Sequence, residues 1–108
     1  MILTTTDEVQ GKKILKNFGL VYGNTIRCSH LGMDLMALLK NIVGGEVTEY
    51  TKLMAESREQ AMDRMCGEAK RLGANAVVGI KFSTSELMLG AAELLVFGTA
   101  VLVENEAG

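Results

Sequence analysis

The amino-acid sequence predicts a single α+β domain over residues 1–108, in which two helices pack on a mostly antiparallel sheet. A long helical pattern over residues 46–72 stops at Gly73, and an apolar strand pattern follows at once from Ala76. Alternating apolar residues near both ends of the chain are typical of further strands. A chain of 108 residues has the size of one domain, and burying more surface between subunits would stabilise it.

The N-terminal region predicts two strands. Residues 2–4 form a short β-prone start, and residues 14–22 alternate so that one face of a strand is strongly apolar. That face carries Ile14, Lys16, Phe18, Leu20 and Tyr22. Gly23-Asn24 predicts a turn or a bulge before a short extended segment at residues 25–27.

A first helix is predicted between Ser29 and Ile42, with Ser29 as its N-cap and Gly44-Gly45 as its stop. Only Asp34 and Lys40 within it carry charge. A helix that is apolar on nearly all sides is normally buried on several of them, so we expect a neighbouring subunit to cover part of it.

The second predicted helix, residues 46–72, has acidic residues near its start and Lys70 and Arg71 in its last turn, which suits the helix dipole. Its inner stripe is spaced by three and four residues and consists of Tyr50, Met54, Ser57, Ala61, Met65, Ala69 and Leu72. We expect Gly73 to end the helix in a left-handed conformation.

The C-terminal third predicts two more strands. The first runs from Ala76 to Ser83, and Gly79 inside it indicates a bulge or a closely packed neighbour. Residues 83–86 are polar and predict a turn. The last strand, residues 93–103, is apolar on both alternations, which is typical of a strand that is central or covered on both faces.

Composition excludes several classes of function. The formal net charge is −2 and the basic residues are scattered, so the electrostatic term that dominates nucleic-acid affinity is missing. No apolar run is long enough to cross a bilayer, and the N-terminus lacks the pattern of a signal peptide. We therefore expect a cytoplasmic protein without nucleic-acid or membrane partners, whose two cysteines are free thiols.

The sequence around the glycine junction resembles the YbjQ-like family of uncharacterised prokaryotic proteins. The matching segments cover nearly the whole chain and include 21–23, 42–45, 57–62, 69–79 and 98–101. The resemblance implies a dodecin-like subunit that assembles into a ring-shaped homopentamer and a heavy-metal-binding domain. The residues of this signature are Arg58, Gly73, Ala74, Asn75 and Gly79. Arg58 is expected to pair with a carboxylate such as Glu49 or Glu93, or to bind an anion.

Cys28-x-His30 is the one local pair of soft-metal ligands, because residues two apart in an extended segment point to the same face. Two ligands are too few for a structural zinc site, so ring symmetry or Cys66 would have to supply more. The alternatives are a buried thiol beside a surface histidine for Cys28 and His30, and core packing at the edge of the helical stripe for Cys66.

No constellation of nucleophile, base and acid stands out, so we expect a binding protein rather than an enzyme. The leading hypothesis is a homo-oligomer that sequesters or senses a soft metal ion or a small ligand. The alternative is an adaptor ring that recognises a protein partner through the apolar segment Leu87-Met88-Leu89, and an enzyme of unknown reaction is third.

Overall fold

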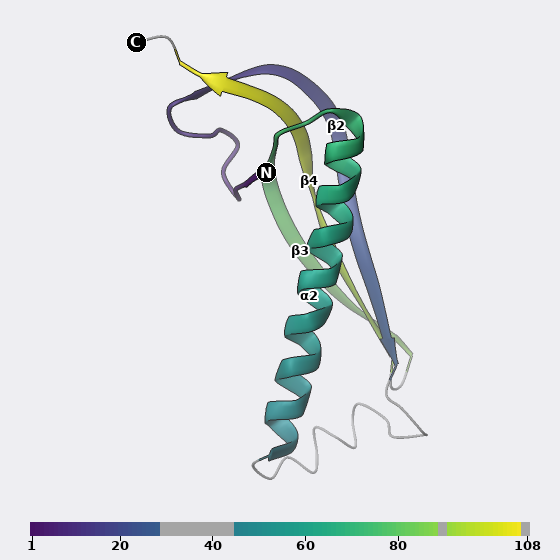
Figure 1. The fold of residues 1–108 in the computed structure, drawn as a ribbon. Coiled ribbons are helices and arrows are strands. Elements are labelled where there is room, and N and C mark those ends of the chain that lie inside the picture. Colours follow the sequence, from purple (N-terminus) through teal and green to yellow (C-terminus); the bar gives the residue numbers. More distant parts are fainter. Residues whose placement is uncertain (29–44, 89–90, 107–108) are drawn as a thin grey trace.

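The computed structural model describes residues 1–28, 45–88 and 91–106. Within these ranges the elements are β1 (Ile2–Leu3), β2 (Lys12–Cys28), α2 (Gly45–Leu72), β3 (Ala76–Met88) and β4 (Ala91–Asn105). The predicted α+β class is confirmed, with one helix and one four-stranded sheet in the described part of the chain (Figure 1). The helix predicted between Ser29 and Ile42 lies outside the described residues.

The strand order of the sheet is β1-β3-β4-β2. β4 pairs antiparallel with both β2 and β3, whereas β1 pairs parallel with β3, so the sheet is mixed. β4 therefore occupies a central position, as its apolar character on both alternations predicts.

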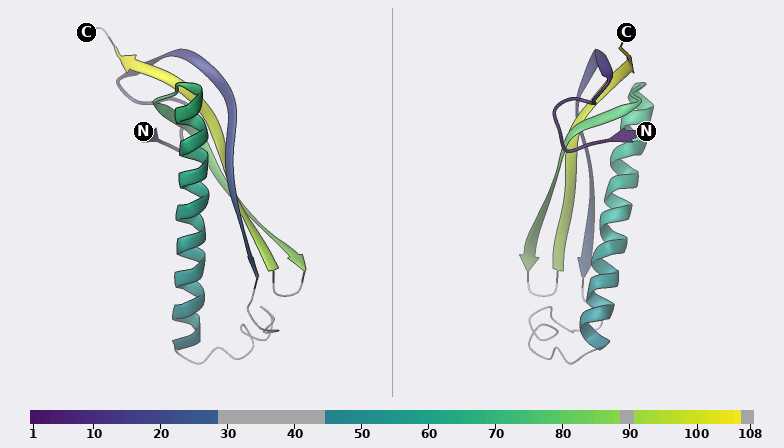
Figure 2. Two further views of the ribbon diagram at one scale, coloured as in Figure 1. Left: turned by 45° about the vertical axis from the view of Figure 1, so that its right-hand side comes forward. Right: turned by 90° about the vertical axis from the view of Figure 1, so that its left-hand side faces the viewer.

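The helix α2 lies along one face of the sheet, closest to β2 and β4, as the views in Figure 2 show. No other helix of the described ranges covers the opposite face. The long elements make the chain elongated, with extents of 57 × 24 × 16 Å and a radius of gyration of 17.4 Å. A compact domain of this length would have a radius of about 13 Å.

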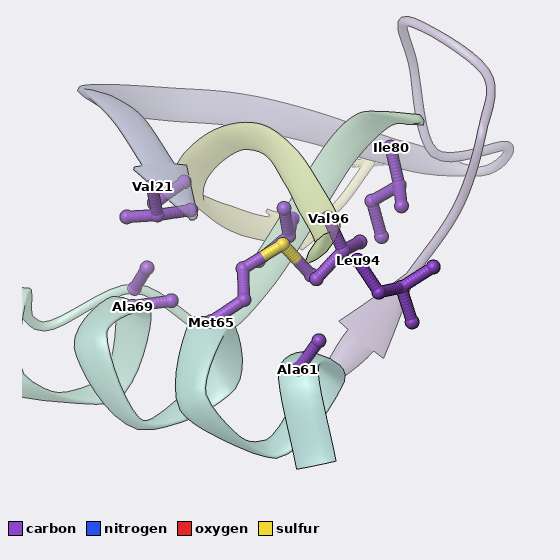
Figure 3. Packing of buried hydrophobic residues seen from close by; sticks show 10 residues of the cluster. Val21, Ala61, Met65, Ala69, Ile80, Leu94 and Val96 are labelled. Carbon is purple, nitrogen blue, oxygen red and sulfur yellow. The ribbon is translucent and has the colours of Figure 1, made fainter. Parts of the chain in front are cut away.

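The core lies between α2 and the sheet, and Met65 is at its centre with no exposed surface (Figure 3). The predicted inner stripe of the helix is confirmed where its side chains are described: Ser57, Ala61, Met65 and Ala69 are buried, and Met54 and Leu72 pack against the core. Aliphatic side chains from three strands complete the cluster, including Val21, Val77, Ile80, Leu94 and Val96.

Gly23 is the point where the helix and the sheet approach most closely. A Cβ placed on Gly23 would lie 2.0 Å from the carbonyl oxygen of Ala61 and 2.7 Å from the amide nitrogen of Met65. The predicted turn at Gly23-Asn24 is therefore wrong: β2 continues through both residues, and the glycine serves close packing.

Two bulges interrupt the first half of β2. The register with β4 shifts between Ile14 and Lys16 and again between Asn17 and Gly19, so that one extra residue is inserted each time. Each inserted residue exchanges the two faces of the strand beyond it, so the two insertions together restore the original alternation. The strand predicted for residues 14–22 is confirmed, and Leu20 and Tyr22 share one face as predicted. That face is exposed, whereas Val21 on the other face is buried.

The two glycines of the junction behave as predicted. Gly73 has φ +97° directly after α2, and Gly79 has φ +62° where the register between β3 and β4 shifts. The turn predicted at residues 83–86 is wrong, since these residues continue β3 and pair with β4. Serine and threonine are tolerated there because the side chains are exposed.

We predict that Gly23→Ala lowers the free energy of unfolding by about 3 kcal/mol or more, because the added methyl group collides with helix backbone that cannot move independently. Gly67→Ala is the control: a Cβ there meets nothing within 4 Å, and alanine is favoured over glycine in a helix by about 1 kcal/mol. Urea unfolding of both variants measures the difference. A Gly23→Ala protein as stable as the wild type would contradict the close contact.

Candidate functional site

Cys28 is the last residue of β2 and lies opposite Ala91 of β4. His30 lies outside the described residues. The neighbouring Arg27 fixes this end of the strand to the helix: its Nε donates to Ser57 Oγ at 2.8 Å and its Nη2 donates to Gln60 Oε1 at 2.6 Å. The backbone of Cys28 is therefore held near the level of Ser57.

Cys66 lies elsewhere along the helix. It is nine residues beyond Ser57, which corresponds to roughly 14 Å along the helix axis. The described backbone thus does not bring Cys28 and Cys66 of one chain together. Across residues 1–28, 45–88 and 91–106 there is also no group of three or more His, Cys, Asp or Glu side chains that could hold a metal ion. The described residues of a single chain do not fit a four-ligand metal site.

Cys66 lines a groove of about 770 Å³ between α2 and the part of the sheet that α2 does not cover. The lining residues come from the helix, β1 and β3 and are Leu3, Ala55, Arg58, Glu59, Met62, Asp63, Cys66 and Phe82. Cys66 is half-buried at the edge of the apolar stripe, as predicted. It is not one of the fully buried core residues.

Arg58 is exposed on the rim of this groove. Its predicted partner Glu93 instead accepts a hydrogen bond from Asn24 Nδ2 at 3.1 Å. The side chain of the other predicted partner, Glu49, lies outside the described part of the chain.

The remaining signature residues hold the fold together. The amide of Gly73 donates to Lys70 O and that of Ala74 donates to Ala69 O, both at 3.0 Å, which closes the end of α2. The side chain of Asn75 bonds twice to Val103, donating from Nδ2 to its carbonyl oxygen at 2.9 Å and accepting from its amide at Oδ1 at 2.8 Å. Gly73, Ala74 and Asn75 therefore have a structural role.

A wholly apolar feature lies on the face of the sheet opposite α2. A shallow depression there is lined only by apolar surface, from the side chains Leu20, Tyr22, Leu95 and Phe97, which we call the outer patch. Leu20 is 69% exposed and Tyr22 is 58% exposed. Ile26, on the same side of β2, is also exposed. The sequence predicted an apolar face with Leu20 and Tyr22 but did not show that this face lies on the side of the sheet away from α2.

The segment Leu87-Met88-Leu89, predicted to bind a protein partner, is described only in part. Leu87 is 49% exposed at the end of β3, whereas the side chain of Met88 and the whole of Leu89 lie outside the described residues. One exposed leucine is not unusual on a soluble protein and does not by itself indicate a partner.

Comparison with known families gives a clear result. Residues 1–104 match the model of the YbjQ family, which is described as "Putative heavy-metal-binding". The chain belongs to the YbjQ family. The family predicted from the glycine junction is therefore confirmed.

Curated relatives of this YbjQ-family chain cover 90% or more of its length. A UPF0145 protein of Dehalococcoides mccartyi is 55% identical and covers 96% of this chain and 100% of its own. A UPF0145 protein of Methanosarcina acetivorans is 50% identical, with coverages of 97% and 99%. The one from Acinetobacter baylyi is 57% identical and covers 90% of each chain.

A solved structure shares the fold. The crystal structure of a protein of unknown function from Pediococcus pentosaceus, assigned to the DUF74 family, superposes with a TM-score of 0.62 at 15% identity. The match covers 96% of this chain and 98% of that one. Separately, none of the described helices is long and apolar enough to cross a bilayer.

We predict that Cys66 reacts slowly with alkylating reagents at neutral pH. Burial raises the pKa of its thiol, Lys70 opposes this, and Asp63 reinforces it. Because the thiolate is the nucleophile, a raised pKa leaves less of it at pH 7. The test uses a Cys28→Ser protein, in which mass spectrometry measures the rate of iodoacetamide labelling at Cys66 between pH 7 and 10. The pH at which this rate is half-maximal should be higher than for a free cysteine peptide.

Asp63→Asn shifts that midpoint downward, because a negative charge that disfavours the thiolate is removed. Lys70→Gln shifts it upward for the opposite reason. A wild-type midpoint below that of the peptide would contradict the assignment.

Proposed function

We propose that this chain is the building block of a homo-oligomer that binds a ligand without transforming it, and that the ligand class is a soft heavy-metal ion. The outer patch supports the homo-oligomer. The family description and the pair Cys28-x-His30 support a soft heavy-metal ion as the ligand.

The outer patch favours self-association because its apolar side chains stand on a face that no described helix covers. The elongated shape strengthens this argument: the chain exposes 7115 Å², whereas a compact monomer of its mass exposes roughly 5,800 Å². Large exposed apolar patches commonly mark protein interfaces. A second copy covering Leu20 and Tyr22 would remove this surface from water.

A metal site fits this chain only as a shared site. Cys28 at the end of β2 lies beside a part of α2 that is distant from Cys66. The described residues of one chain provide no cluster of three or more ligands. Symmetry repeats the pair Cys28 and His30 in every copy, so several copies of the ring would together supply the ligands that one chain lacks. The proposed number is fewer than one ion per chain.

Cys66, the thiol in the groove between α2, β1 and β3, does not have the character of an activated nucleophile. Burial raises the pKa of that thiol, whereas a catalytic cysteine is activated by a lowered pKa.

Self-association is tested by Tyr22→Lys, which places a charge in the middle of the outer patch. The wild type is expected to be an oligomer by light scattering at micromolar concentration, with the five-fold ring implied by the family resemblance as the expected form. Tyr22→Lys should raise the dissociation constant at least tenfold, because a charge cannot be buried there without a partner. Gln10→Lys adds the same charge in the exposed loop before β2 and should change nothing. A monomeric wild type would contradict self-association.

Metal binding is tested by titrating the reduced protein with Cd²⁺ and following the thiolate-to-metal absorption band. The wild type should take up the ion in a fixed ratio below one per chain. Cys28→Ser should abolish the band and His30→Ala should weaken it. Cys66→Ser is the matched control and should leave it unchanged, because Cys66 lies far along the helix. Absence of stoichiometric uptake would overturn the metal assignment while leaving self-association intact.

A further inference from the structure

The end of β2 is tied to α2 by polar contacts of Thr25, Arg27, Ser57 and Gln60, which we call the strand clasp. Thr25 Oγ1 donates to the carbonyl oxygen of Ser57 at 3.2 Å. Arg27 Nε donates to Ser57 Oγ at 2.8 Å, and Arg27 Nη2 donates to Gln60 Oε1 at 2.6 Å. Val21 is the last described residue of β2 in the apolar core, so polar groups hold the end of the strand on the helix instead.

The two bonds of Arg27 fix its side chain in one orientation. A guanidinium presents its N–H groups in a rigid plane, so Nε and Nη2 reach two acceptors at once only along one edge. The serine acceptor is fixed as well, because Ser57 is 1% exposed and its Oγ donates to Leu53 O at 2.8 Å. A lysine carries the same charge on a flexible stem without this fork, and it cannot reproduce both bonds. Charge and geometry can therefore be separated by substitution.

Arg27 directly precedes Cys28, which the metal binding proposed above uses as a ligand. Cys28 pairs with Ala91 of β4, which places its backbone within the sheet. Arg27 in turn holds that end of the sheet against the helix. In a shared site each copy has to present its ligand at the same place. Substituting residues that orient metal ligands typically lowers metal affinity by about 10- to 100-fold.

We propose that Arg27 is a positioning residue for metal binding. By holding the end of β2 on Ser57 and Gln60, it keeps Cys28 where copies of the chain can share an ion. This inference rests on the proposed metal binding and adds to it a residue that does not touch the ion. A positioning role differs from a general role in stability, because its loss lowers the affinity for the metal in a protein that remains folded.

Arg27→Lys tests the positioning role, because it keeps the charge and loses the fork. In a titration of the reduced protein with Cd²⁺, the dissociation constant should rise about tenfold while the number of ions per chain stays the same. Arg64→Lys is the matched control. Arg64 donates from α2 to the carbonyl oxygen of Asn24 in β2, so the same change weakens another contact between the two elements. The control should bind Cd²⁺ like the wild type, and thermal unfolding should show that both variants are folded.

Two further measurements separate positioning from stability. Ser57→Ala removes the acceptor of Arg27 Nε, so the double variant should bind Cd²⁺ less weakly than the product of the two single effects predicts. In the metal-free protein, the amides of residues 26–28 should exchange with solvent faster in Arg27→Lys than in the wild type. Amides in the middle of β4, at residues 96–101, should keep their wild-type rates.

The possible results distinguish failure of the positioning role from failure of metal binding. A wild type that takes up no Cd²⁺ would overturn metal binding and the positioning role with it. A wild type that binds Cd²⁺ no more tightly than Arg27→Lys would overturn the positioning role alone. An equal loss of affinity in Arg64→Lys would also overturn it, since the effect would then come from a looser fold.

Discussion

The structure depends on one close contact, where α2 rests directly on the backbone of β2 at Gly23. Because Gly23 has no side chain, the backbone of Ala61 and Met65 comes near enough for the helix to seat its small residues on the sheet. This contact fixes the helix over β2 and β4 and leaves the β3 side of the same face open, where the groove containing Cys66 lies. A single helix placed in this way covers only part of one face of a long sheet. The uncovered apolar surface follows directly from it.

Much of the fold could be predicted from the sequence, and the reasons are local. The long helix is determined by its repeating apolar stripe, its end by Gly73, and the irregularity at Gly79 by the cost of glycine inside a strand. What could not be predicted is which face of β2 meets the helix. The close contact at Gly23 decides it, because Val21 lies on the same face as Gly23 and is buried, whereas Tyr22 lies on the other face and is exposed.

The candidate sites were predicted less well than the fold, again for a physical reason. Ligands such as Cys28 and Cys66 are recognised by residue type in a sequence. Whether they meet depends on their positions along the neighbouring strand and helix. Here the hydrogen bonds of Arg27 to Ser57 and Gln60 set that level and separate the two cysteines. The outer patch had the opposite difficulty: its apolar residues in β2 were recognised as one face of a strand, but the sequence does not show that this face points away from the helix.

The placement of α2 also bears on the proposed self-association. A helix seated over β2 and β4 leaves the opposite face of the sheet without a described helix, and Leu20 and Tyr22 are exposed there. Covering these side chains would remove apolar surface from water, which is the usual driving force of association. The seating of the helix at Gly23 and the proposed homo-oligomer are linked in this way.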